Sequence, residues 1–204
     1  MAAAASHTTG RRSFDELWRD LELVPEGYTG EIVDGEIITT PRPGPPHLVT
    51  TSALGVLLGG PFRFGIGGPG GWIILDEPRI RFGDEARLPD LAAWRADRYV
   101  TPEDGPYVVI PDWLCEVLSP GTARSDRTKK MPLYARHRVG HVWLIDPVLQ
   151  TLEVYRLQGE SWGLVRTDGA DEKVRAEPFD AVELDLAMIW GGAVPPERRE
   201  LDPP

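Results

Sequence analysis

The chain has 204 residues, 41% of them hydrophobic and 26% charged, which suits one globular domain with one core and excludes an intrinsically disordered chain. Its formal net charge of −10 at pH 7 argues against broad, charge-driven binding to nucleic acid. Because Cys115 is the single cysteine, the chain forms neither an internal disulfide nor a zinc site built from thiolates, and we expect this thiol to be buried and structural.

The N-terminal segment, residues 1–12, is expected to be flexible. It contains a run of alanines but lacks the basic start and the long apolar core of a secretion signal. Elsewhere no apolar stretch reaches the roughly 18 residues that a membrane helix requires. We therefore expect a cytoplasmic protein that does not enter a membrane.

A helix and a hairpin are predicted next. Residues 13–23 have apolar side chains at helical spacing, and Ser13 with Glu16 three positions later matches a capping box. Residues 30–38 predict a hairpin, because Asp34-Gly35 supplies a tight turn between β-branched residues.

A second helix is predicted over residues 47–58, and Gly59-Gly60-Pro61 ends it. The glycine-rich segment 65–71 lacks the lysine and Ser/Thr of a phosphate-binding P-loop, so a flexible turn is expected there. The buried stripe of the helix is expected to consist of Leu48, Val49, Leu54, Leu57 and Leu58.

The rest of the chain predicts mainly strands. A helix is expected over residues 125–137 and a short one over 183–190, and residues 193–204 are expected to form a loose tail. The pattern as a whole predicts a single domain over residues 13–192, of the α/β class (α+β type), with a central mixed sheet flanked by helices. The expected strands cover residues 72–75, 79–82, 91–94, 113–118, 142–145, 152–157 and 162–166.

Two carboxylates stand at the ends of predicted strands. Asp90 opens one apolar run and Glu116 lies inside another. If the two strands pair at a spacing of about 4.8 Å, both carboxylates can reach one hard divalent cation. Asp112 lies four residues before Glu116 on the same strand, at about 13 Å between Cα atoms, which is too far to share that cation. We interpret Asp112 as a strand-entry residue.

The environment of Glu116 leaves two interpretations open. By strand alternation it shares a face with Leu114 and Leu118, where a charge is costly unless it is paired or bound to a metal. The alternative is an edge strand on which Glu116 is simply exposed.

A basic segment follows. Residues 121–141 contain six Lys or Arg against one acidic residue, a local charge of +5, which is compatible either with a phosphate-bearing substrate or with a solvated helix face. Asp126, Lys130 and Tyr134 are spaced i, i+4, so they form one stripe on a helix. Pro132 lacks an N–H, so the helix alternatively begins near Lys130 after an irregular lead-in over residues 122–129.

The chain resembles the Uma2 family of restriction-endonuclease-like proteins, within the PD-(D/E)XK nuclease superfamily. The matching pieces occur in the family's order over roughly residues 25–190. They are Glu31-Ile-Val-Asp-Gly-Glu36, Pro41 with His47, Pro89-Asp90, Glu116-Val-Leu-Ser-Pro120, Asp126 with Lys130 and Tyr134, Val142-Trp-Leu-Ile-Asp-Pro147 and Val154-Tyr155.

This resemblance implies that Asp90, Glu116 and the Val117 carbonyl bind Mg²⁺ or Mn²⁺, and that Glu31 is a further acidic group near the metal. It also implies a displaced lysine. In the usual (D/E)-X-K pattern the lysine follows the acid by two residues, but Leu118 stands there, so the resemblance assigns the ammonium to Lys130.

Other residues join the expected site as substrate contacts. These are Tyr134, Arg127, Lys129 and His47, although Tyr134 is equally explained as a packed aromatic and His47 as a structural residue at a helix start. One further departure from the family is Arg138, where we expect a glycine after the helix.

The function that the resemblance implies is metal-dependent hydrolysis of phosphodiester bonds in DNA. Two alternatives stay open: a catalytically silent protein that binds nucleic acid or a partner, and a phosphodiesterase acting on RNA or small nucleotides. Because a duplex has two strands and one small domain presents one active site, we expect a homodimer.

Overall fold

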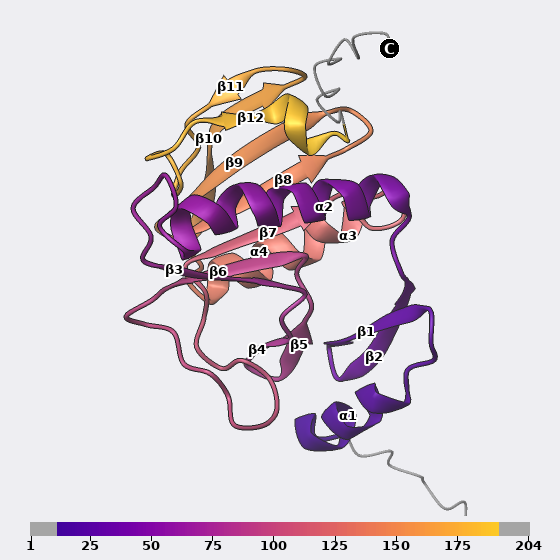
Figure 1. Ribbon diagram of the computed structural model, residues 1–204. Coiled ribbons are helices and arrows are strands. Elements are labelled where there is room, and N and C mark those ends of the chain that lie inside the picture. The colour runs from indigo at the N-terminus through magenta and orange to yellow at the C-terminus, as the bar shows by residue number, and fades with distance from the viewer. Residues whose placement is uncertain (1–11, 192–204) are drawn as a thin grey trace, which may run out of the picture.

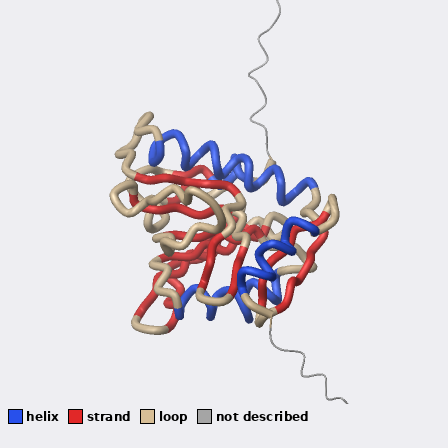
Figure 2. The backbone as a smooth tube through the Cα atoms, turned by 90° about the horizontal axis from the view of Figure 1, so that it is seen from below, coloured by secondary structure: helices blue, strands red, loops and turns tan. Residues whose placement is uncertain are grey.

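A computed structural model describes residues 12–191, which form layers around a central six-stranded sheet. Its strand order is β10-β9-β8-β7-β6-β3, in which β7 and β8 run parallel and all other neighbours antiparallel. The sheet lies between the long helix α2 and the shorter helices α3 and α4 (Figure 1; Figure 2). The predicted fold class is therefore confirmed. The strands are β3 (Trp72–Asp76), β6 (Leu91–Arg95), β7 (Trp113–Val117), β8 (His141–Asp146), β9 (Thr151–Gln158) and β10 (Ser161–Gly169).

A second sheet, which the sequence analysis did not predict, accompanies the central one. Its order is β2-β1-β5-β4, and the strand expected over residues 79–82 belongs here. A two-stranded ribbon, β11 with β12, completes the described sheets. The strands are β1 (Tyr28–Val33), β2 (Glu36–Pro41), β4 (Ile80–Phe82), β5 (Glu85–Arg87), β11 (Lys173–Val174) and β12 (Leu184–Asp185). Those missed from sequence, β5, β11 and β12, have two or three residues and are too short to show alternation.

The N-terminal helix and the hairpin form as predicted. Helix α1 (Phe14–Asp20), continued by the 3₁₀ turn η1 (Leu21–Leu23), starts with a complete capping box between Ser13 and Glu16. In the β1–β2 turn, Asp34 and Gly35 both have positive φ, 53° and 84°. Two consecutive residues with positive φ give the turn that matches the twist of the hairpin.

Helix α2 (Pro45–Leu58) begins two residues earlier than predicted and continues as the π-helical turn η2 (Gly59–Arg63). Its buried residues are His47, Thr50, Leu54 and Leu58, whereas Leu48 and Val49 are exposed. The expected stripe is wrong at these two positions, because the apolar side chains of this helix are spread around its axis and give no contrast from which to choose the buried face.

The third helical region is continuous but not uniform. Helices α3 (Ala123–Ser125) and α4 (Met131–Arg136) are joined by the π-helical turn η3 (Asp126–Lys130), in which Met131 N–H donates to the Asp126 carbonyl. The predicted helix is confirmed, and the alternative of an irregular lead-in over residues 122–129 is wrong. Pro132 lies two positions after the end of η3, where its missing N–H leaves the normal helical ladder incomplete.

The backbone conformation after helix α4 explains why the family pattern has a glycine at the position of Arg138. Arg138 follows the C-cap residue of α4, His137, and has a φ of 64°, in the left-handed region that favours glycine. Its N–H donates to the Ala135 carbonyl at 3.0 Å, so the arginine is held in this conformation.

Strand β7 divides the core into two faces by alternation. Trp113, Cys115 and Val117 pack in the cluster on the α2 face, whereas Leu114 and Leu118 pack in the cluster on the α4 face. The alternation predicted for this strand is confirmed, and Cys115 is buried as expected. The face of Leu114 and Leu118 is also the face of Glu116.

The C-terminal region corrects one further prediction. Residues 183–190 hold β12 followed by the 3₁₀ turn η4 (Leu186–Ile189) rather than one helix. The predictions for residues 1–11 and for the tail lie outside the described residues. No helix within residues 12–191 is long and apolar enough to cross a membrane.

Candidate active site

The site begins where β6 and β7 lie side by side. Leu91 pairs with Cys115 in this antiparallel register, so the preceding residue, Asp90, comes opposite Glu116. The Val117 N–H donates to Asp90 Oδ2 at 2.6 Å, which ties the loop carboxylate to the neighbouring strand. Local pairing of two strands thus brings together two acids that lie 26 positions apart in the sequence.

The helical segment after β7 covers Glu116. Lys130 Nζ lies 2.8 Å from Glu116 Oε2, and the Tyr134 hydroxyl donates to Glu116 Oε1 at 2.5 Å. Lys130 Nζ also lies 3.3 Å from Asp126 Oδ1. The i, i+4 stripe predicted from sequence therefore faces the sheet. Because the Glu116 side chain is 3% exposed, its interpretation as a solvent-facing residue on an edge strand is wrong.

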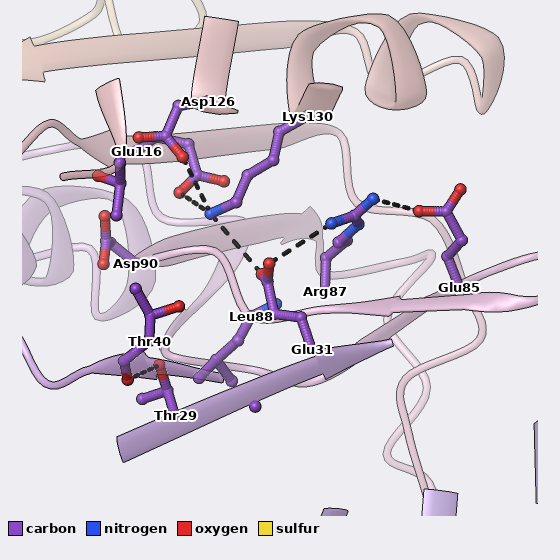
Figure 3. A network of polar contacts seen from close by, with 12 residues as sticks. Thr29, Glu31, Thr40, Glu85, Arg87, Leu88, Asp90, Glu116, Asp126 and Lys130 are labelled. Atoms are coloured by element: carbon purple, nitrogen blue, oxygen red, sulfur yellow. Dashed lines mark hydrogen bonds and ion pairs between the residues drawn. The ribbon is translucent and has the colours of Figure 1, made fainter. Parts of the chain in front are cut away.

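Glu31 reaches the same ammonium from the hairpin side. Its Oε1 lies 3.7 Å from Lys130 Nζ and accepts the Leu88 N–H at 2.8 Å, while its Oε2 lies 3.5 Å from Arg87. Arg87 is buried and also pairs with Glu85. Figure 3 shows this row of alternating charges, in which Lys130 lies between the three carboxylates of Glu31, Glu116 and Asp126.

His47 completes the set from helix α2. Its Nε2 lies 3.0 Å from Asp90 Oδ1, and the side chain is buried. Since Val117 binds the other oxygen of Asp90, the carboxylate is fixed from both sides. His47 is therefore more than a helix-start residue, because it contacts the site directly.

The pKa values of the site residues are shifted because several carboxylates are buried beside too few cations. Burial raises the pKa of Glu116 well above its usual range, and the ammonium of Lys130 opposes this only in part. Burial also raises the pKa of Asp126. For Lys130, burial acts to lower the pKa, but Glu116 and Glu31 outweigh it and hold the pKa well above its ordinary value. Lys130 therefore stays protonated, and its charge compensates the buried carboxylate of Glu116 only in part.

These residues line a cleft of about 460 Å³. Its walls come from the β1–β2 hairpin and from residues 119–130, and its floor carries Asp90, Glu116, Val117 and Lys130. Lys129 lines the cleft as well. The predicted acidic residues, the lysine, Val117 and His47 thus meet in one place.

Two predicted substrate contacts lie elsewhere. Arg127 is paired with Glu153 at 2.6 Å, outside the cleft. Tyr134 is fully buried behind Glu116, so its hydroxyl positions that carboxylate and does not reach a substrate. As expected, Asp112 lies at the opposite end of β7, where it accepts the Arg95 N–H at 2.8 Å and pairs with Arg98.

Sequence reasoning missed Arg87 and gave Asp126 no role in the site. Both are charged residues that the fold buries. For Asp126 the signal was available, since it shares the i, i+4 stripe with Lys130. Arg87 stands in a three-residue strand with no pattern, and its partner Glu31 is 56 positions away, so no local signal could have found it.

The donor chemistry of the cluster fits a hard divalent cation. Three carboxylates, those of Glu31, Glu116 and Asp126, surround the single ammonium of Lys130 (Figure 3), and the carboxylate of Asp90 lies beside them, so negative charge is in excess. Within residues 12–191, no group of three or more His, Cys, Asp or Glu side chains is arranged as a metal site. Mg²⁺ does not require one, because it retains several waters and binds proteins through one or two carboxylates.

The mixed sheet and the acid–lysine cleft at the ends of strands β6 and β7 define an α/β protein of the nuclease-like class. The chain belongs to the Uma2 family, whose description is "Putative restriction endonuclease" and whose model matches residues 14–188. The family predicted from the sequence motifs is thereby confirmed.

A solved structure agrees with this assignment. The chain is similar to "a putative nuclease belonging to DUF820 from Anabaena variabilis ATCC 29413", with 26% sequence identity and a TM-score of 0.68. The match covers 88% of this chain and 97% of the other. No curated protein matches the chain.

Proposed function

We propose that this protein is a metal-dependent endonuclease that hydrolyses phosphodiester bonds in DNA. The observation that supports this most is the convergence of Asp90, Glu116 and Lys130 from three separate segments onto the floor of one cleft. Membership of a family described as "Putative restriction endonuclease" supports nucleic acid as the substrate.

Asp90, Glu116 and the Val117 carbonyl would hold Mg²⁺ or Mn²⁺. When bound, such an ion lowers the pKa of a water and neutralises charge on the phosphate. The chain fixes both acids in advance, because His47 and the Val117 N–H hold Asp90, and Tyr134 holds Glu116 from inside the core.

Lys130 would supply a permanent positive charge beside the reacting phosphate. Its ammonium stays protonated because three carboxylates surround it. A fixed cation orients the attacking water or stabilises the charge that develops in the transition state, and it needs no rearrangement at the moment of reaction. Glu31 would act by holding this ammonium over the cleft rather than by contacting the substrate.

Cellular setting and assembly belong to the same proposal. The protein acts in the cytoplasm, where a lone thiol such as Cys115 stays reduced. Two copies would be needed to cut both strands of a duplex in one encounter, and the homodimer is proposed on that ground.

The test is incubation of the purified protein with plasmid DNA, single-stranded DNA and RNA, in Mg²⁺, Mn²⁺ or EDTA. We expect cleavage of DNA with either metal, none in EDTA, and loss of cleavage in Asp90→Asn. The matched control is Asp112→Asn, which changes an acid on the same strand pair outside the cleft.

Three results would overturn the proposal. They are the absence of cleavage of any substrate, full activity of Asp90→Asn, and cleavage of RNA alone. Full activity of Lys130→Ala would remove the lysine from the mechanism while leaving the carboxylates in place.

A further inference from the structure

The carboxylates and the lysine lie deep in the cleft. The exposed fractions of the side chains are 3% for Glu116, 11% for Lys130, 15% for Glu31 and 16% for Asp90. A phosphodiester must therefore enter the cleft to reach them, because a strand that lies on the outer surface stays out of reach.

The cleft is also small. Its volume of about 460 Å³ falls in the range of pockets that hold one small molecule, roughly 300–1,000 Å³. The β1–β2 hairpin forms one wall with Thr29 and residues 38–42, and residues 119–130 form the other. A segment of one strand fits such a space, whereas a duplex brings a second strand that has to remain outside.

The charge of the residues that line the cleft also distinguishes a single strand from a duplex as the substrate. Among the described residues that line the cleft, five are acidic and four are basic. Two of the four, Arg87 and Lys130, are largely buried and already paired with carboxylates. Only Arg42 and Lys129 remain near the solvent, and Arg42 lies 3.4 Å from Glu77. Binding to duplex DNA draws most of its non-specific affinity from many phosphate contacts of Lys and Arg, which this cleft does not offer.

Neutral hydrogen-bond donors take the place of these cations. Six hydroxyl side chains line the cleft, and two of them, Ser119 and Thr122, lie 3.0 Å apart on one wall. Hydroxyls bind phosphate and sugar oxygens without counterion release. The six are Thr29, Thr39, Thr40, Ser119, Thr122 and Ser125.

We propose that the cleft accepts a single, locally unpaired strand of DNA in preference to an intact duplex. This inference rests on the proposed function and names the form of its substrate. A single strand can bring its phosphate to the floor of the cleft between hairpin and helix, and cutting it engages one active site.

The experiment compares three fluorescent DNA oligonucleotides of the same sequence: a single strand, its duplex, and the duplex with a central unpaired bubble. Binding is measured by anisotropy in EDTA, and cleavage is measured separately in Mg²⁺. We expect the single strand and the bubble to bind at least about tenfold more tightly than the duplex, with cuts confined to unpaired nucleotides.

Salt dependence tests the charge argument independently. If Arg42 and Lys129 neutralise two phosphates, the plot of log affinity against log salt for the single strand has a slope of about −1.4, and Lys129→Met reduces it to about −0.7. Arg127→Met is the matched control on the same helical turn, and it leaves the slope unchanged because Arg127 pairs with Glu153 outside the cleft. Thr39→Val weakens binding severalfold without changing the slope.

The outcomes separate this inference from the proposed function. Preferential binding of the single strand without any cleavage refutes the nuclease and leaves the inference standing. Equal or tighter binding of the duplex, or no binding of any oligonucleotide, refutes the inference. A slope steeper than about −4 would reveal a broad basic surface and would refute it as well.

Discussion

Strand β7 has a carboxylate at each end, and the fold treats the two in opposite ways. Asp112, just before the strand, is partly exposed and has a complete set of partners in the Arg98 guanidinium and the Arg95 N–H. Glu116, near the other end, is buried and shares one ammonium, that of Lys130, with two further carboxylates. One acid is satisfied by the protein and the other is left short of positive charge. The same residue class is thus fully paired at one end of the strand and short of positive charge at the other, where the proposed chemistry lies.

The largest effect is expected from Glu116→Gln. The amide keeps the shape but removes a charge that would bind the metal, so cleavage of DNA should fall by about 10³-fold or more. Initial rates in Mg²⁺ measure this, with Asp112→Asn as the control that stays within a few-fold of wild type. Equal losses of cleavage in Glu116→Gln and Asp112→Asn would contradict the distinction between the two ends of β7.

Removal of the shared cation should produce the largest change in stability. Lys130→Met leaves Glu116 and Asp126 buried without their ammonium, and we expect the free energy of unfolding to fall by about 3 kcal/mol at pH 8. Urea denaturation measures this. Arg98→Met, which removes the exposed cation at the other end, should cost less than about 1 kcal/mol.

The loss of stability in Lys130→Met should increase as the pH rises. The folded-state pKa of Glu116 and of Asp126 is raised, so the folded protein binds more protons than the unfolded chain, and stability falls as the pH rises above the ordinary carboxyl range. Lys130→Met removes the cation that opposes this loss of stability. Its free energy of unfolding should therefore fall furthest below that of wild type at pH 8, and the difference should shrink toward pH 5. A deficit that grows on acidification would show that Lys130 stabilises by some other interaction.

A smaller loss of stability is expected from Asp112→Ala. Arg95 loses its acceptor and Arg98 its partner, and we expect a cost of about 1–2 kcal/mol with little change in cleavage. Asp112→Asn keeps an acceptor oxygen for the Arg95 N–H and should lose less. Thermal denaturation followed by circular dichroism gives both values, and a large loss of activity in Asp112→Ala would place this acid in the chemistry after all.

The smallest effect concerns Arg138, in the turn that leads to the Asp112 end of the sheet. Arg138→Gly relieves a positive φ and should stabilise the protein by about 0.5–1 kcal/mol, less the lost hydrogen bond to the Gly159 carbonyl. Arg138→Ala keeps the strained backbone and loses the same bond, so it should be the less stable of the two. The reverse order would mean that the positive φ at this position does not favour glycine over alanine.

The predictions that succeeded depend on strong local patterns. Alternation in residues 113–118 fixed the face of Glu116, and i, i+4 spacing placed Lys130 over it. Predictions failed where the pattern carries no contrast, as in the apolar helix α2, where Leu48 and Val49 are exposed. They also failed where a contact joins distant segments, as between Arg87 and Glu31, because only the folded chain brings such residues together.

Lys130 lies on η3 rather than at the position of Leu118, so the proposed activity would depend on the local folding of that helical segment. An acid and a lysine two positions apart on one strand stay together whenever that strand is paired, but here 14 positions separate Glu116 from Lys130. Opening of the segment from residue 119 to residue 136, without global unfolding, would withdraw the ammonium and leave the sheet intact. The protein would then be inactive while most of its backbone amides remained protected from hydrogen exchange.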